Sequence, residues 1–367
     1  MASDNESVGA QFLNLNGSDL TTTTTEKAEG FKPHPRCKYI HHADYKPFHV
    51  NLVSQIATYV IFSIAIFGFG TNLLSFVVLS MERSNNTSIF YLKCLAFADM
   101  FICFFYIIFD FQFQLYSHTL LLDMTAEINH VMKRMRPYTR NTRLLFSGIG
   151  DLVTLLIAID RYIVVCWPLK AVGIISKKKS YIYIAVVSII SLGDVAKNVF
   201  KYTTKYARNP CTGHVRWNQK LTPFARNRYF RYYEVFIRAP LFTVIPTVIV
   251  VLITIRLIFT LRRAGAARKT MSANNQTANS SSSDRGLTLA LILISCFYLV
   301  KKAFFFNGAV TNLVQTLGGT IGPAVSSFYL NMVQDIIRMI VASTNFVIYC
   351  VSRRRFRNQL KAMFSIS

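Results

Sequence analysis

The sequence predicts an all-α membrane protein in which seven transmembrane helices form a bundle and a short amphipathic helix follows on the membrane surface. Composition is the first observation behind this prediction, because 52% of the 367 residues are hydrophobic and only 16% are charged. Ordinary soluble domains carry about 25% charged residues. The second observation is a series of seven apolar stretches. Each is near or above the roughly 20 residues that a helix needs to cross the hydrocarbon core of a bilayer.

The predicted spans divide the chain into three parts. A polar outer tail covers residues 1–50, the bundle covers 51–352, and the surface helix with a short cytoplasmic tail covers 353–367. The outer tail reads as disordered, and its two Asn-x-Ser sequons, at Asn5 and Asn16, are candidate glycosylation sites. The spans are expected at residues 53–81, 89–115, 143–167, 181–200, 234–261, 287–310 and 325–351.

The segments around these spans are polar or amphipathic. The span at 181–200 is the weakest of the seven, because Asp194 and Lys197 lie near its end. Residues 264–285, which include the run NNQTANSSSSD, are expected to form a flexible loop. The C-terminal run SRRRFRNQLKAMF places arginines on one helical face and apolar side chains on the other. That pattern predicts a helix lying on a membrane surface.

The net charge of +24 favours partners that carry negative charge, such as lipid headgroups or an acidic ligand. Nucleic acid is the usual partner of so basic a soluble chain, but seven membrane spans argue against it. The sequence has no nucleophile–base pair, metal-ligand spacing or CxxC pair that would indicate an enzyme or a metal centre. The lysine and arginine bias of the loops does not decide which end of the bundle faces the cytoplasm.

The most informative stretch is Arg143–Leu169, which reads RLLFSGIGDLVTLLIAIDRYIVVCWPL. It is an apolar, membrane-length segment with the charged triplet Asp160-Arg161-Tyr162 near one end. Charges at such a place are costly and therefore usually functional. The triplet and the following Trp-Pro-Leu resemble the third helix and second intracellular loop of rhodopsin-like (class A) G-protein-coupled receptors. The resemblance implies that this triplet engages a heterotrimeric G protein.

Motifs in other spans extend the resemblance in the expected order. The first span contains GTN ending at Asn72, and the second contains LAFAD ending at Asp99. The seventh contains NFVIY, from Asn345 to Tyr349, where the family has Asn-Pro-x-x-Tyr. The family resemblance and the sequons of the tail favour an N-terminus outside the cell.

The resemblance assigns roles to these residues. Arg161 is expected to face the G protein and Asp160 to hold it at rest, while Asn345 and Tyr349 repack on activation. A polar cavity that binds a sodium ion is expected at Asn72, Asp99, Asp151 and Asn345, with Asp151 as a second acid near Asp99. The alternative is that Asp99 bonds to backbone and hydroxyl groups and holds no ion. No other cofactor or metal is expected.

Several positions depart from the family pattern. Phe297 and Leu299 stand in CFYL where the family commonly has Cys-Trp-x-Pro, and Phe346 replaces the proline of the seventh helix. Their effect on activation is left open. The third helix also lacks the cysteine at its outer end that usually pairs with the second outer loop.

The missing cysteine leaves Cys211 of the second outer loop without its usual partner. Cys37 is the other cysteine in a segment that the family topology places outside. A Cys37–Cys211 bridge between tail and loop is therefore predicted, with two free thiols as the alternative. The remaining five cysteines lie in or beside apolar spans, where a free thiol behaves as a small hydrophobe.

The ligand-binding half of the bundle is expected to be basic. Residues 197–231 hold nine basic residues and no acid, a field that would attract an acidic ligand. The alternative is internal pairing, for example of Asp335 with Lys301 or Arg338. The positions expected at pocket depth are Arg143, Arg238, Phe297, Lys301, Lys302, Asp335 and Arg338.

Together these features predict a plasma-membrane receptor for a peptide, possibly an acidic one, that activates a heterotrimeric G protein. The closing run NFVIYCVSRRRF also resembles divergent invertebrate neuropeptide receptors. Two alternatives within the fold are a receptor for a small anionic ligand and a seven-helix binding protein that does not signal. A transporter is a distant alternative, because no internal repeat is evident.

Overall fold

The computed structural model describes most of the predicted bundle and its surface helix. The predicted glycosylation sites and both cysteines of the predicted bridge, Asn5, Asn16, Cys37 and Cys211, lie outside the described residues. Those expectations therefore stay predictions. The structure describes residues 48–82, 86–111, 126–208, 215–271, 279–316 and 324–364.

The described chain is almost entirely helical, apart from one two-stranded hairpin. Three short stretches, η2 to η4, are π-helical turns within or beside longer helices. The elements in chain order are α1 (Phe48–Met81), α2 (Thr87–Phe105), η2 (Tyr106–Phe111), α4 (Ala126–Cys166), α5 (Pro168–Ile174), α6 (Lys177–Lys201), β1 (Tyr202–Arg208), β2 (Val215–Leu221), α7 (Pro223–Arg226), α8 (Arg228–Tyr232), η3 (Tyr233–Arg238), η4 (Pro240–Val244), α9 (Ile245–Met271), α10 (Asn279–Thr316), α11 (Ala324–Ser352) and α12 (Arg354–Phe364).

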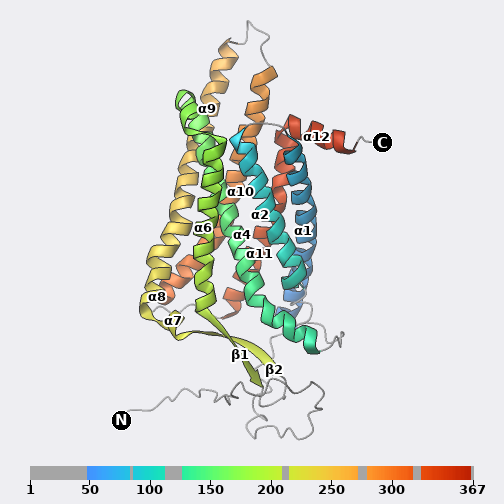
Figure 1. Ribbon diagram of the computed structural model, residues 1–367, viewed down its shortest axis with the longest axis vertical. Coiled ribbons are helices and arrows are strands. Elements are labelled where there is room, and N and C mark those ends of the chain that lie inside the picture. The colour runs from blue at the N-terminus through green and yellow to red at the C-terminus, as the bar shows by residue number, and fades with distance from the viewer. Residues whose placement is uncertain are drawn as a thin grey trace.

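The long helices form one bundle with α4 running through its middle (Figure 1). α4 packs against α2, α6, α9 and α10, whereas α1 packs against α2 and α11. The predicted all-α seven-helix architecture is confirmed. Within the described residues, six helical segments are long and apolar enough to cross a membrane: Gln55–Met81, Thr87–Phe109, Lys177–Lys201, Arg228–Arg263, Gly286–Phe306 and Met332–Ser352.

The seventh helix of the bundle is α4, which is not among those six. The span at 181–200, which was expected to be the weakest of the seven, is long and apolar enough to cross a membrane within Lys177–Lys201. The prediction that it is the weakest span was therefore wrong. The reason is that α4 runs through the middle of the bundle, so neighbouring helices shield its charged residues from lipid along its length. Arg143, Asp160 and Arg161 are all buried.

Three helices extend further than the apolar pattern predicts. α9 continues to Met271 and α10 begins at Asn279, so the loop expected over residues 264–285 is helical on both sides. Alanine and arginine, which are strong helix formers, supply much of the added part of α9. α4 likewise begins at Ala126, well before the expected start at 143. Apolar periodicity marks the lipid-crossing part of a helix and not its polar ends.

The β1–β2 hairpin is the feature that the sequence reasoning missed. Its strands pair antiparallel from Tyr202↔Leu221 to Arg208↔Val215. It follows α6 directly, and Thr222 donates its backbone N–H to the Lys201 carbonyl at 3.1 Å, which closes its base. The hairpin lies at the end of the bundle opposite α12 (Figure 1).

The predicted surface helix is α12. Phe356 of α12 is buried, while Arg354, Arg355 and Lys361 are exposed. The Phe356 ring lies 5.5 Å from the ring of Tyr349 and 5.9 Å from that of Phe346. The phenylalanine that replaces the family's proline therefore helps to hold α12 against α11.

Candidate functional site

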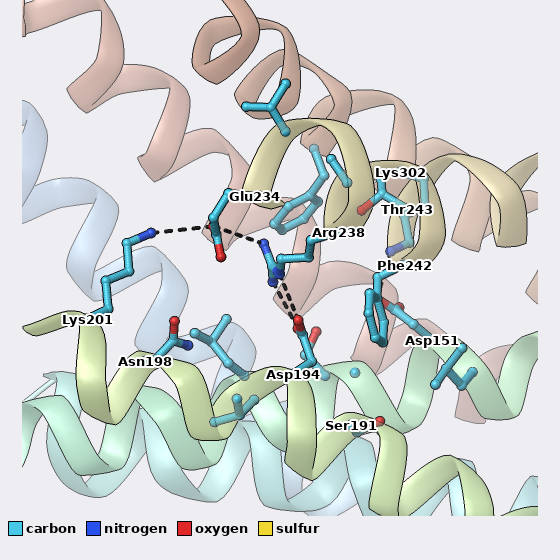
Figure 2. A pocket seen from close by; sticks show the side chains of 18 of the residues that line it. Asp151, Ser191, Asp194, Asn198, Lys201, Glu234, Arg238, Phe242, Thr243 and Lys302 are labelled. Carbon is cyan, nitrogen blue, oxygen red and sulfur yellow. Dashed lines mark hydrogen bonds and ion pairs between the residues drawn. The ribbon is translucent and has the colours of Figure 1, made fainter. Parts of the chain in front are cut away.

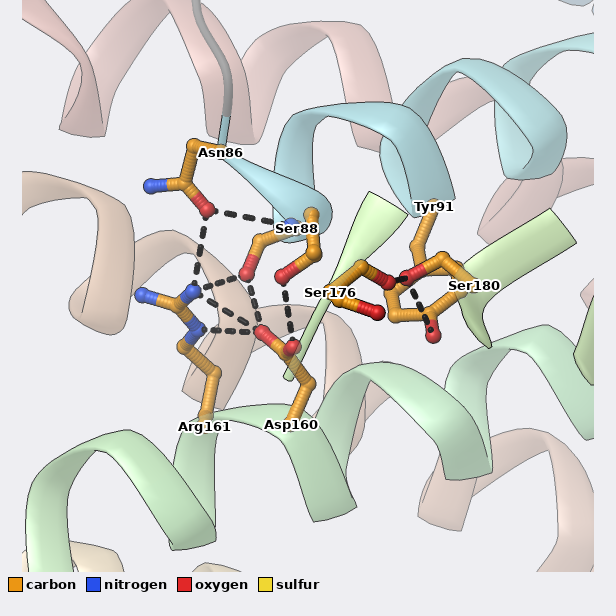
Figure 3. Close-up of polar contacts among 8 residues, drawn as sticks. Asn86, Ser88, Tyr91, Asp160, Arg161, Ser176 and Ser180 are labelled. Carbon is orange, nitrogen blue, oxygen red and sulfur yellow. Dashed lines mark hydrogen bonds and ion pairs between the residues drawn. The ribbon is translucent and has the colours of Figure 1, made fainter. Parts of the chain in front are cut away.

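The Asp160–Arg161 pair lies at the end of the bundle that bears α12, where α4 meets the start of α2 (Figure 3). Both side chains are 5% exposed, and Arg161 Nη2 lies 2.9 Å from Asp160 Oδ2. Asp160 also accepts hydrogen bonds from Thr87 Oγ1, at 2.7 Å, and from Ser88 Oγ. Its carboxylate thus sits at the N-terminus of α2, where the helix dipole favours negative charge.

The start of α2 also holds the guanidinium of Arg161. Asn86 caps α2 by accepting the backbone N–H of Ser88 at 3.0 Å. The same Asn86 Oδ1 accepts from Arg161 Nη2 at 3.2 Å, and Ser88 Oγ accepts from Arg161 as well. The cap explains why the Asn86 side chain is in position to bind Arg161, since a capping side chain is held by the helix that it starts. Arg161 is therefore turned toward α2 and enclosed. The sequence reasoning did not include Asn86, Thr87 or Ser88.

The third member of the triplet, Tyr162, lies partly buried beside Trp167, with ring centroids 5.3 Å apart. Its ring therefore packs against the turn that follows α4 and is not part of the Asp160–Arg161 network.

Asp99 of α2 and Asn345 of α11 meet, as the motifs predict, and Asn72 of α1 binds the backbone of α11. Asn345 Nδ2 donates to Asp99 Oδ2 at 2.7 Å, and Asn72 Nδ2 donates to the Ala342 carbonyl at 3.0 Å. All three side chains are buried. Tyr349, one turn beyond Asn345 on α11, is fully buried. These contacts tie the first and second helices to the seventh.

Asp151 does not join this group as a second open carboxylate. Lys301 Nζ donates to Asp151 Oδ1, and Lys302 Nζ donates to Asp151 Oδ2 at 2.9 Å. Both carboxylate oxygens are therefore bound by ammonium groups from α10. A sodium ion needs such oxygens for itself, so Asp151 does not fit as a ligand of that ion. The expectation for Asp151 failed because the rotation of α10 toward α4 is not readable from the sequence.

A cavity of about 550 Å³ opens beyond Asp151, toward the hairpin end of the bundle (Figure 2). α4, α6, the α7–η4 segment, α10 and α11 supply its walls. Among its lining residues are three carboxylates, five basic side chains and three phenylalanines. These are Asp151, Asp194 and Glu234; Lys201, Arg231, Arg238, Lys302 and Arg338; and Phe230, Phe242 and Phe305.

An ion-pair network crosses one wall of this cavity, between α6 and η3 (Figure 2). Arg238 donates to both oxygens of Asp194, at 2.7 and 2.9 Å, a two-pronged contact that fixes orientation as well as charge. Lys197 lies 2.9 Å from both Asp194 and Glu234. Lys201 lies 3.4 Å from Glu234. Asp194, which weakened the predicted span, is thus compensated inside the bundle.

The predicted pocket residues divide into two groups. Arg238, Lys302 and Arg338 line the cavity. Asp335 pairs with Arg338 at 2.9 Å, so that part of the internal-pairing alternative is correct, although Lys301 pairs with Asp151 and not with Asp335. The internal pairs reduce the free positive charge that the sequence suggested.

The other four predicted residues, Arg143, Phe297, Lys301 and Asp335, are not among the residues that line the cavity. Arg143 is buried with its guanidinium 5.6 Å from the ring centre of Tyr106. Phe297 packs against the main apolar core. The cavity also includes Glu234 and Ser191, which the sequence reasoning missed because neither belongs to a recognisable motif.

The five cysteines expected to be free thiols, Cys94, Cys103, Cys166, Cys296 and Cys350, are all free in the structure. A further buried pair was not expected: Arg353 Nη2 lies 2.8 Å from Glu82 Oε2, with side chains 5% and 6% exposed. It joins the end of α1 to the junction of α11 and α12.

A bundle of seven helices with a charged triplet at one end and a polar cavity at the other defines a seven-transmembrane receptor. The model of the family described as "7 transmembrane receptor (rhodopsin family)" matches residues 70–352. That range is well over half of the chain, so the protein belongs to the rhodopsin family of G-protein-coupled receptors. This is a family of multi-pass membrane receptors for signal transduction and not an enzyme family. No curated protein matches the chain.

Proposed function

We propose that this receptor lies in the plasma membrane with its N-terminus outside, binds an extracellular peptide and activates a heterotrimeric G protein. The buried Asp160–Arg161 pair carries the proposal. Arg161 is buried, and its charge is satisfied by Asp160 and the start of α2. A G protein reaches such an arginine only after the helices repack, so the structure supports a resting state. A bound ligand then acts by favouring the repacked state.

Polar contacts that run from the cavity to the centre of the bundle support coupling of a bound ligand to the helices that repack. Lys302 lines the cavity and also binds Asp151. Asp151 lies in electrostatic range of Asp99, and Asp99 binds Asn345 of α11. A ligand group that draws Lys302 away from Asp151 changes the charge balance at the centre of the bundle.

A peptide ligand with an acidic group fits the cavity. Its volume of about 550 Å³ lies within the usual range for small-molecule pockets, about 300–1,000 Å³. It therefore holds one end of a peptide, and the rest contacts the outer surface. Five of its charged lining residues are basic and three are acidic, so the net charge of the lining favours a carboxylate, which would compete with Asp151 for Lys302 and with Asp335 for Arg338. The likeness to invertebrate neuropeptide receptors agrees with this proposal.

A small anionic ligand is the second candidate, because the same cavity encloses a molecule of that size. The two candidates are distinguished by which compounds activate the receptor, peptides or small anions. A non-signalling binding protein would bind without any second-messenger response, and a transporter would move its substrate across the membrane.

The function is tested by measuring second-messenger output from cells that express the receptor and are challenged with amidated and acidic peptides. Arg161→Ala should abolish the response while ligand binding and surface expression persist, because Thr87 and Ser88 still hold Asp160. Lys361→Ala, which removes an exposed cation of α12, is the matched control and should keep the response. A second-messenger response that survives Arg161→Ala would refute the role of Arg161 as the switch residue.

The anionic preference is tested separately with Arg338→Gln. A charge-assisted hydrogen bond contributes about 1.5–3 kcal/mol, so the potency of an acidic peptide should fall by roughly tenfold or more. Arg231→Gln, at an exposed lining position, should have a smaller effect. If only neutral or basic peptides activate the receptor, the receptor function stands and the acidic ligand is rejected.

A further inference from the structure

Four ionisable side chains gather between α2, α4 and α10 in the middle of the bundle. They are the carboxylates Asp99 and Asp151 and the ammonium groups of Lys301 and Lys302. Asp151 accepts hydrogen bonds from both lysines, and Lys301 and Asp151 are each in electrostatic range of Asp99. α4 also approaches Asp99 closely, since a Cβ added at Gly150 would lie 3.9 Å from Asp99 Oδ1.

The formal charges of this cluster cancel. Two carboxylates face two ammonium groups, so an added monovalent cation would leave a net positive charge inside the bundle. Taking an uncompensated ion out of water into such an environment costs several kcal/mol even after relaxation. Protonation of Asp99 would make the cluster more positive still, so it would not help a cation to bind.

The oxygen atoms of Asp151 lead to the same conclusion. Both oxygens of Asp151 accept from lysines, and Asp99 Oδ2 accepts from Asn345. Hard cations are held by shells of oxygen ligands. In this cluster the ammonium groups already occupy the positions that such an ion would take on Asp151.

We propose that Lys301 and Lys302 replace a sodium ion as the cations that neutralise Asp99 and Asp151, so that the stability of this receptor does not depend on sodium. The two cations are part of α10, so the neutralising charge moves with that helix. A neutral residue in place of one lysine leaves one carboxylate charge in excess and creates a site for a small cation.

The test is thermal unfolding of the purified full-length receptor in sodium, potassium or N-methylglucamine chloride at equal ionic strength. Wild type should have the same midpoint in all three salts. Lys301→Gln should gain a saturable, sodium-specific rise of about 2–4 °C, as expected for a ligand that binds only the folded state. Lys301→Arg keeps the charge and should remain indifferent to the choice of salt.

Lys197→Gln is the matched control, because it removes a lysine from the carboxylates Asp194 and Glu234 at the outer wall. Lys201 and Arg238 still balance those acids, so no sodium response should appear. The proposal is overturned if sodium specifically stabilises the wild type, or if folded Lys301→Gln ignores sodium. If Lys301→Gln does not fold, Lys302→Gln makes the same charge change, and the wild-type comparison decides by itself. These measurements use no ligand and no G protein, so their outcome is independent of the proposed function.

Discussion

Gly286→Ala should raise the signalling of the receptor without ligand. Gly286 lies near the start of α10, where the helix touches the junction between α11 and α12. A Cβ added there would lie 2.2 Å from the carbonyl oxygen of Ser352. Ordinary contacts need about 3.4 Å or more, so the two backbones must separate by about 1 Å. The obstructing atom belongs to the backbone, and no side-chain rotation relieves the clash.

The magnitude follows from the cost of overpacking, typically about 1–3 kcal/mol. If that cost falls on the resting packing and not on the opened one, the equilibrium shifts by about 5–150-fold. Separation of α10 from the α11–α12 junction opens the end of the bundle where Arg161 is enclosed. Basal second-messenger output, normalised to surface expression, should therefore rise clearly above that of the wild type.

Gly193→Ala is the control for this prediction. A Cβ at Gly193 of α6 meets nothing within 4 Å, yet the substitution makes the same gain in helix propensity, up to about 1 kcal/mol. Gly193→Ala should leave basal output unchanged. If Gly286→Ala folds and its basal output equals that of Gly193→Ala, the contact with Ser352 does not restrain the resting state.

Three further predictions concern other buried contacts. Glu82→Gln should lower the midpoint of thermal unfolding, because removing one partner of a buried ion pair costs about 3–5 kcal/mol. The double variant Glu82→Leu, Arg353→Leu should lose less than the two single variants together. Ser88→Ala removes one hydrogen-bond donor to Asp160, which should cost the resting state about 1 kcal/mol and raise basal signalling several-fold. Unchanged basal output would argue that this hydrogen bond does not restrain the resting state. Asp194→Asn should weaken ligand potency at least tenfold in a concentration–response assay, because the cavity wall loses its ionic anchor; equal potency would show that the wall is not used.

The fold class could be predicted from the sequence for a simple physical reason. A bilayer has one hydrocarbon thickness, so apolar stretches of one characteristic length reveal the spans without knowledge of their packing. The surface helix could equally be predicted from the sequence, because its two faces differ in residues that lie close in sequence. The polar helix ends and the β1–β2 hairpin could not be predicted, since their stability depends on contacts beyond the apolar pattern.

The candidate site was predictable only in part. Motif spacing correctly placed Asn345 beside Asp99 and Asp160 beside Arg161. It assigned Asp151 wrongly, because the partners of that carboxylate, 150 and 151 residues away, depend on how α10 is rotated against α4.

The sequence by itself determined that this chain crosses a membrane as a seven-helix receptor of the rhodopsin family, because span length, triplet and motif order are local properties. Tertiary structure alone decided which charges neutralise each other: Lys301 and Lys302 on Asp151, Arg238 on Asp194, Arg353 on Glu82. Ion pairs inside a bundle form between helices that are distant in sequence. Their choice of partner follows from helix rotation and axial position, which the packing of the whole core sets.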